Sequence, residues 1–90
     1  MTTTIWKFPL QVIDKQVISM PKDAIVLTVQ VQGSQPCLWA RLSPDTPSEK
    51  RTFLTYGTGH EIESEPGPYI GTYQLEGGQL VFHVFESRGG

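Results

Sequence analysis

The sequence predicts an all-β protein, a single small antiparallel β-sandwich or open barrel of about seven strands. Three observations lead to this fold class. No 11-residue stretch places apolar residues at the i, i+3, i+4, i+7 spacing of a helix. Nine glycines and seven prolines interrupt the 90 residues at short intervals. Between them lie alternating runs rich in Val, Ile, Thr, Tyr and Phe, and we expect residues 1–90 to form one domain.

The first two expected strands end at prolines. Residues Thr4–Phe8 precede Pro9, and residues Lys15–Met20 precede Pro21. Proline ends a strand because it has no backbone N–H to donate to the ladder.

The third and fourth strands, Ala24–Gln32 and Pro36–Leu42, form a hairpin around Gly33-Ser34, which suits a type II′ turn. The turn sets Val29 opposite Leu38, Thr28 opposite Trp39, Leu27 opposite Ala40 and Val26 opposite Arg41. The predicted core face carries Ile25, Leu27, Val29, Val31, Leu38, Ala40 and Leu42. The predicted outward face carries Val26, Thr28, Gln30, Gln32, Cys37, Trp39 and Arg41.

The fifth expected strand, Thr52–Thr58, lies between the two long loops of the chain. The loop Ser43–Arg51 is polar and contains two prolines, so we expect it to be exposed. The loop Gly57–Pro68 is the longest break between strands, and long loops in compact domains often carry function.

The last two strands, Tyr69–Leu75 and Leu80–Glu86, form a second hairpin around Gly77-Gly78. This turn pairs Leu75 with Leu80, Tyr73 with Phe82 and Thr72 with His83. The predicted core face carries Tyr69, Gly71, Tyr73, Leu75, Leu80, Phe82 and Val84. The other face, with Ile70, Thr72, Gln74, Val81, His83 and Phe85, is too apolar for plain solvent and too polar for a core, which is typical of a surface that meets a ligand or partner.

Composition limits the classes of function. The net charge is −2 and the cationic residues are scattered, which argues against nucleic acid as a main partner. Cys37 is the single cysteine and cannot form an internal disulfide, so we expect a buried thiol in a reducing compartment. We see no signal peptide and no apolar stretch that spans a bilayer, and we expect a soluble, cytoplasmic protein.

The tetrapeptide Gly57-Thr58-Gly59-His60 is the most suggestive local motif. Glycines let backbone N–H groups crowd around an anion, and the threonine hydroxyl adds a donor, so a phosphate is a candidate ligand. No Lys-Ser/Thr pair and no helix pattern follow, which excludes a P-loop. The competing interpretation is a plain glycine turn at the end of a strand.

Two histidines, His60 and His83, are candidates for chemistry. His60 is the residue of choice for a general base if the protein is an enzyme, although no nucleophile is visibly paired with it. Neither histidine has the spacing of a zinc motif, and Glu61, Glu63 and Glu65 follow a pattern typical of a solvated loop. We therefore expect no metal and no cofactor.

Trp39 and Arg41 share the outward face of the first hairpin. An indole plane beside a guanidinium suits a stacked base with a phosphate, and it equally suits a protein–protein contact. On the second hairpin, Thr72 and His83 are the cross-strand pair that we expect to close a pocket or a subunit interface.

Several motifs together resemble a known family. They are Ile-Trp-Lys-Phe-Pro-Leu (5–10), Met-Pro (20–21), Val-Gln-Val-Gln (29–32), Pro-Cys-Leu-Trp-Ala (36–40), Tyr-Gly-Thr-Gly-His (56–60), Tyr-Ile-Gly-Thr-Tyr-Gln (69–74) and Leu-Val-Phe-His-Val-Phe-Glu (80–86). The chain thereby resembles small uncharacterised all-β proteins found mainly in bacteriophage genomes and prophages. That family has no established activity, so the resemblance supplies a context and no catalytic residue.

The phage context favours a protein that acts by binding. We expect a homo-oligomer that sequesters a small anionic, nucleotide-derived molecule such as a host immune signal, in the cytoplasm of the host cell. The expected ligand-binding residues are Trp39, Arg41, Gly57, Thr58, Gly59, His60, Thr72 and His83. The alternatives are a nucleotide hydrolase or phosphodiesterase that uses His60, and a protein-binding inhibitor or virion structural component.

Overall fold

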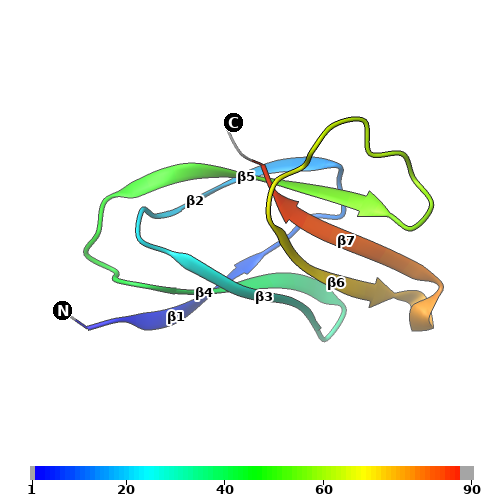
Figure 1. Ribbon diagram of the computed structural model, residues 1–90. Coiled ribbons are helices and arrows are strands. Elements are labelled where there is room, and N and C mark those ends of the chain that lie inside the picture. Colours follow the sequence, from blue (N-terminus) through cyan, green and yellow to red (C-terminus); the bar gives the residue numbers. More distant parts are fainter. Residues whose placement is uncertain (1, 88–90) are drawn as a thin grey trace.

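The computed structural model describes residues 2–87 and is all-β, as the sequence predicts (Figure 1). Seven strands form two antiparallel sheets that do not close into a barrel. In chain order the elements are β1 (Thr4–Pro9), β2 (Lys15–Pro21), β3 (Ile25–Gln32), β4 (Gln35–Leu42), β5 (Ser48–Gly57), β6 (Tyr69–Leu75), the 3-10 turn η1 (Glu76–Gly78) and β7 (Leu80–Glu86).

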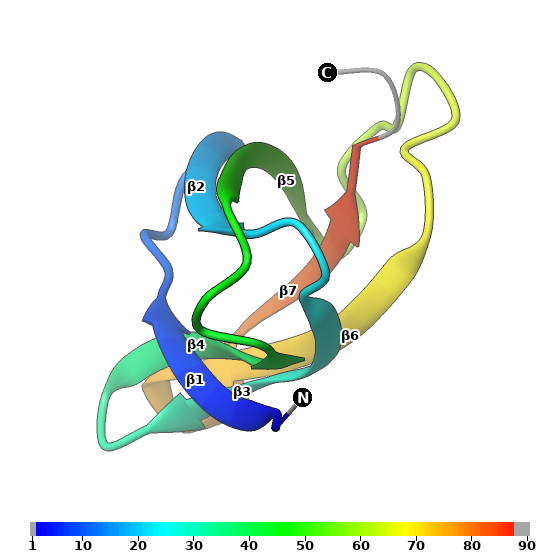
Figure 2. The ribbon, with the colours of Figure 1, turned by 90° about the vertical axis from the view of Figure 1, so that its left-hand side faces the viewer.

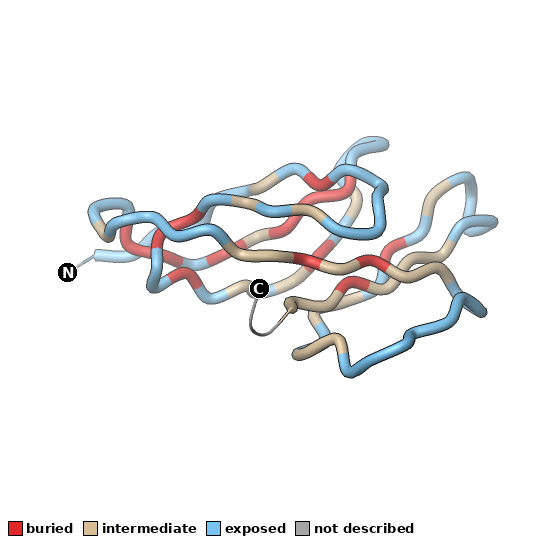
Figure 3. The backbone as a smooth tube through the Cα atoms, turned by 90° about the horizontal axis from the view of Figure 1, so that it is seen from above, coloured by how far each residue is buried: buried red, intermediate tan, exposed pale blue. Residues whose placement is uncertain are grey.

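The strands are divided between a three-stranded and a four-stranded sheet. Sheet A has the order β1-β4-β3, and sheet B has the order β2-β5-β7-β6. Figure 2 shows β2 and β5 lying above β1, β4 and β3, so that the two sheets enclose the core between them. Most of the buried residues lie in the strands of the two sheets, whereas the long loop between β5 and β6 is exposed along most of its length (Figure 3).

The core joins both sheets through aliphatic and aromatic side chains. Its largest fully buried members are Phe53, Leu10, Met20, Leu38, Leu42 and Val84. The sheets approach most closely where β6 crosses β3. A Cβ atom on Gly71 would lie 2.8 Å from Cγ1 of Val29, so glycine is required at this contact.

The first hairpin has the predicted turn but a different register beyond it. Val29 faces Leu38 and Thr28 faces Trp39 as expected, and Gly33 has the positive φ of a type II′ turn. A β-bulge between Val26 and Thr28 then shifts the pairing, so that Val26 rather than Leu27 lies opposite Ala40. The predicted inward positions of Leu27 and Ile25 are therefore wrong.

The exposures of these residues follow from the bulge. Leu27 is 49% exposed and Ile25 is 58% exposed, while Val26, predicted to point outward, packs against the core. A bulge adds one residue to one strand and reverses the alternation on one side of it. Cys37, which the register places on the outward face, is 1% exposed, in agreement with the expected buried thiol.

The second hairpin has both the predicted turn and the predicted pairs. Leu75 faces Leu80, Tyr73 faces Phe82 and Thr72 faces His83. A second β-bulge lies between Tyr69 and Gly71, and the predicted orientations of the residues at this bulge are wrong. Tyr69, predicted in the core, is 58% exposed, and Ile70, predicted on the outward face, packs against the core. Leu80 is also largely exposed, since it lies beside the turn at the end of the sheet.

The fifth strand begins four residues before its predicted start. Residues 48–51 pair with the second half of β2, which shortens the expected loop Ser43–Arg51 to residues 43–47. Arg51 lies on the inward side of this extension. It binds both carboxylate oxygens of Glu86 on β7, at 2.7 and 2.8 Å, and donates to the carbonyl of Ala24 at 2.6 Å. This side chain therefore ties sheet B to the segment that enters sheet A.

Candidate functional site

The outward side of β5, β7 and β6 carries a group of residues that we call the aromatic face. Cross-strand pairing brings Tyr56, His83 and Thr72 into one row, and Phe85 and Tyr69 into the next. Thr58 follows Tyr56 at the end of β5. The aromatic face thus consists of six residues without a formal charge, given a neutral imidazole: Tyr56, Thr58, Tyr69, Thr72, His83 and Phe85.

A chain of hydrogen bonds crosses the aromatic face and includes three of the eight predicted site residues. Nδ1 of His83 lies 2.9 Å from Oγ1 of Thr72, and Nε2 of His83 lies 2.7 Å from Oγ1 of Thr58. The hydroxyl of Tyr69 continues the chain to Oγ1 of Thr72 at 2.5 Å. The imidazole ring is therefore fixed from both sides by hydroxyl groups of the two neighbouring strands.

The chemistry of imidazole gives this series of hydrogen bonds a direction of donation. A neutral ring has one donor nitrogen and one acceptor nitrogen, so one threonine donates to it and the other accepts from it. In one direction the free hydroxyl hydrogen is on Thr58, and in the other it is on Tyr69. The face can therefore present a donor at either end.

Three aromatic rings border this hydrogen-bonded chain. The ring centroids of Tyr56 and Phe85 are 5.8 Å apart at 72°, and those of Tyr69 and Phe85 are 5.4 Å apart at 60°. These inclined contacts are the favourable edge-to-face kind. Because Tyr69 is largely exposed, its ring presents apolar surface beside the hydroxyl of Thr72.

The Gly57–His60 motif forms a tight turn at the end of β5. The N–H of His60 donates to the carbonyl of Gly57 at 3.0 Å, and the N–H of Thr58 donates to the carbonyl of Val81 at 3.2 Å. Gly59 has a φ of 88°, which glycine adopts readily. Two of the three N–H groups that follow Gly57 are thus engaged by the chain, which leaves that of Gly59 for an anion.

His60 and His83 lie on opposite sides of sheet B. The ring of His60 covers Gly57, where a Cβ atom would lie 2.8 Å from Cε1 of the imidazole. Gly57 points inward together with its partner Phe82, whereas Tyr56 and His83 point outward. The two histidines therefore belong to different surroundings, and within residues 2–87 the ring of His60 makes no hydrogen bond to another side chain.

Trp39 and Arg41 lie on the outward side of sheet A, away from the aromatic face. Lys7 places its Nζ atom 5.9 Å from the centre of the Trp39 ring, and the same Nζ donates to Gln32 at 2.6 Å. Nε of Arg41 donates to the hydroxyl of Thr3 at 3.1 Å. The structure therefore divides the eight predicted residues into three groups: Trp39 with Arg41, Gly57 with Gly59 and His60, and Thr58 with Thr72 and His83.

The loop between β5 and β6 adds negative charge near the aromatic face. Glu63 and Glu65 line an open hollow together with Pro66 and Phe85. No group of three His, Cys, Asp or Glu side chains within residues 2–87 is arranged to hold a metal ion. In the same part of the chain, no helix is long and apolar enough to cross a membrane.

Sequence reasoning missed the three aromatic members of this site. Tyr69 was assigned inward because nothing in the sequence marks the bulge that turns it outward. Phe85 was placed on the correct face by alternation but was not selected as a site residue. Tyr56 was detectable, because strand alternation from Thr58 puts both on one side of β5.

Comparison with known proteins gives one match. Neither the curated proteins nor the solved structures include a chain that matches this one. The family described as Domain of unknown function (DUF7352) matches residues 1–90, and the chain belongs to that family.

Proposed function

We propose that this protein is a non-catalytic binding module that captures a small nucleotide-like molecule on the aromatic face. The observation that carries the proposal is the hydrogen-bonded chain Tyr69–Thr72–His83–Thr58 beside three inclined aromatic rings. A nucleobase offers a flat apolar surface and an edge of donors and acceptors. The aromatic face offers the complementary pair of properties.

The reversible direction of the chain supports recognition of a base edge. A terminal hydroxyl donates or accepts according to what the ligand presents, and the rest of the chain follows. In this proposal the contacts of Thr58 and Thr72 with His83 hold the ligand rather than cleave it.

The resemblance to phage and prophage proteins extends the proposal to a role. A small phage protein that binds a nucleotide-derived immune signal in the host cytoplasm removes that signal without turning it over. The proposal includes a homo-oligomer, because large apolar side chains are exposed on both sheets.

Thermal denaturation with a panel of cyclic and ADP-ribose-type nucleotides tests the proposal. A ligand at about 100 times its Kd adds about 2.7 kcal/mol to the free energy of unfolding. The bound molecule should then be recovered intact after heat denaturation. Recovery of a cleaved product, or the absence of any stabilising nucleotide, contradicts the proposal.

The two bulges supply a matched pair of variants. Tyr69→Ala removes an exposed ring from the aromatic face, and Leu27→Ala removes an exposed side chain at the bulge of the first hairpin. We expect Tyr69→Ala to abolish the nucleotide-dependent shift in Tm and Leu27→Ala to retain it. Equal responses of the two variants place the ligand elsewhere.

A protein partner is the second candidate, favoured by the amount of apolar surface outside the aromatic face. Ile5, Val17, Ile25 and Leu27 are each about half exposed or more. Solvent-facing aliphatic groups in this number are typical of proteins that assemble with another chain. Sedimentation of the purified protein tests self-association directly, and a monomer at all concentrations leaves a different protein as the partner.

The hydrolase alternative receives less support, because His60 has no side-chain partner within the described residues. It predicts that His60→Ala removes turnover of a nucleotide while binding is retained. Any nucleotide cleavage that is lost with this single substitution would restore that alternative.

A further inference from the structure

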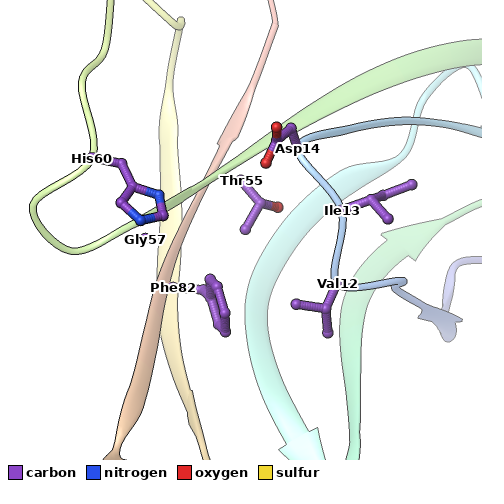
Figure 4. Close-up of a pocket in the computed structure, with 7 residues that line it drawn as sticks. All are labelled: Val12, Ile13, Asp14, Thr55, Gly57, His60 and Phe82. Carbon is purple, nitrogen blue, oxygen red and sulfur yellow. The ribbon is translucent and has the colours of Figure 1, made fainter.

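A small cavity opens on the inward side of β5, behind the aromatic face (Figure 4). Its volume is about 40 Å³, enough for a few waters or the head of a small molecule and too little for a nucleotide. The side chains of Val12, Ile13 and Phe82 form its apolar walls. Asp14, Thr55 and His60 supply its polar groups.

Thr55 is a buried polar residue that has no hydrogen-bond partner within residues 2–87. The residue is 5% exposed, and its Oγ1 atom is buried with no hydrogen bond in the structure. Thr55 lies among the residues that line the cavity, as Figure 4 shows. A water or a ligand group in the cavity would supply the partner that this hydroxyl lacks.

The position of His60 defines one side of the cavity. Its ring lies directly on Gly57, at a distance that leaves no space for a Cβ atom there. Because glycine at this position allows the ring to fold inward, the imidazole faces the same space as Thr55. A neutral ring can accept a hydrogen bond from an occupant through one of its nitrogens.

Charge decides which kind of occupant is favoured. Asp14 is the single residue lining this cavity that has a formal charge when the imidazole is neutral, and the adjoining hollow is lined by both Glu61 and Lys15, whose charges oppose each other. A carboxylate repels an anion and attracts a cation. Carboxylate, hydroxyl and imidazole nitrogen are all acceptors for an N–H donor, and Phe82 adds apolar surface beside them.

We propose that this cavity binds a primary ammonium group carried on a short alkyl chain. The ammonium has three donors, which match Asp14, Thr55 and His60 in number. The methylene groups of the chain contact Val12 and Ile13 at the mouth. The group can belong to a free small amine or to the side chain of a lysine, and both present the same chemistry.

Amide chemical shifts in a titration with propylammonium chloride test this proposal. We expect saturable shifts at Thr55, Gly57 and His60, and none of that kind with 1-propanol or with sodium chloride of equal ionic strength. A titration with N-acetyl-lysine amide distinguishes the two sources of the ammonium group. Saturable shifts at the same amides indicate a site for a lysine side chain, and their absence indicates a site for a free small amine. Equal shifts with the alcohol, or no saturable shift, overturn the proposal.

Two substitutions separate the cavity from general charge effects. Asp14→Asn should weaken propylammonium binding at least tenfold, and Thr55→Val should weaken it at least threefold. Asp45→Asn removes one negative charge from the loop at the opposite end of β5 and should leave the Kd unchanged. A Kd that is the same in Asp14→Asn and Asp45→Asn contradicts the assignment, whether or not nucleotides bind to the aromatic face.

Discussion

The two hairpins, β3–β4 and β6–β7, begin from the same sequence design and end with different surfaces. Each has a glycine turn, strict alternation beside the turn and one β-bulge farther along. In the first hairpin the bulge exposes Leu27 without bringing it to a polar group. In the second it brings Tyr69 to Phe85 and to the hydroxyl of Thr72. A bulge therefore creates a site only where the neighbouring strands already present complementary side chains.

The hairpins also depend on each other, because β6 lies across β3 at Gly71. We expect the largest effect of a single substitution at this contact between the hairpins. Gly71→Ala places a methyl group 2.8 Å from Cγ1 of Val29, and we expect a loss of about 2 kcal/mol in the free energy of unfolding, measured with urea. In a Val29→Ala background the same substitution should cost clearly less. Equal costs in both backgrounds would show that the sheets do not meet at this point.

The ion pair of Arg51 and Glu86 links the second hairpin to the entry of the first. The carboxylate of Glu86 raises the pKa of the Arg51 guanidinium by hydrogen bonding, and Arg51 also holds the carbonyl of Ala24. Glu86→Gln leaves this half-buried cation without its counter-charge, and we expect a loss of about 1–2 kcal/mol in urea denaturation. Glu76→Gln, in the exposed turn η1, is the matched control and should change stability little.

Tyr73 places a buried hydroxyl group in the second hairpin. Within residues 2–87 its hydroxyl is buried without a hydrogen-bond partner, and burial raises its pKa above the ordinary value of 10.0. Tyr73→Phe should therefore raise the free energy of unfolding by about 1 kcal/mol at neutral pH. The phenol is neutral in the fold and ionises first in the unfolded chain, so stability that is present below pH 10.0 is lost as the pH rises through the folded pKa. The Tyr73→Phe variant should lack the part of the alkaline loss in Tm that comes from ionisation of this phenol. If the variant is instead less stable than the original protein, the hydroxyl has a hydrogen-bond partner.

Asp23, just before β3, accepts a hydrogen bond from the N–H of Ser43, just after β4. Hydrogen bonding to Ser43 lowers the pKa of its carboxyl below the ordinary 3.8, with carboxylate oxygens 3.2 and 3.3 Å from the Ser43 nitrogen. The stabilisation is present above pH 3.8 and is lost as the pH falls through the lower folded pKa. Asp23→Asn should make Tm slightly less sensitive to acid, the smallest effect expected here, and an unchanged acid profile would argue against this contact in solution.

Much of the fold follows from the sequence, because alternation and turn residues are local signals. Both turns, the final two strands and the pair Thr72–His83 were predicted correctly for that reason. The bulges were not predictable, since they lie on β3 and β6, the strands through which the two sheets contact each other, and that contact is not a local signal. The early start of β5 was also missed, because Glu49-Lys50-Arg51 has the polarity of a loop and becomes a strand only by pairing with β2.

The candidate site was predicted in part for the same reason. Thr58, Thr72 and His83 meet because antiparallel pairing sets them side by side. The register of the second hairpin was enough to predict the pair Thr72–His83. The separation of Trp39 from His83 depends on which sheet each hairpin joins, and that is a property of the whole topology. The inward position of His60 depends on a turn that crosses from one side of β5 to the other.

A map of amide chemical shifts with the most stabilising nucleotide derivative tests the central claim most directly, because it compares both hairpins in one experiment. The account predicts that the largest shifts fall on Tyr56, Tyr69, Thr72, His83 and Phe85. Shifts centred instead on Lys7, Trp39 and Arg41 of sheet A would contradict it.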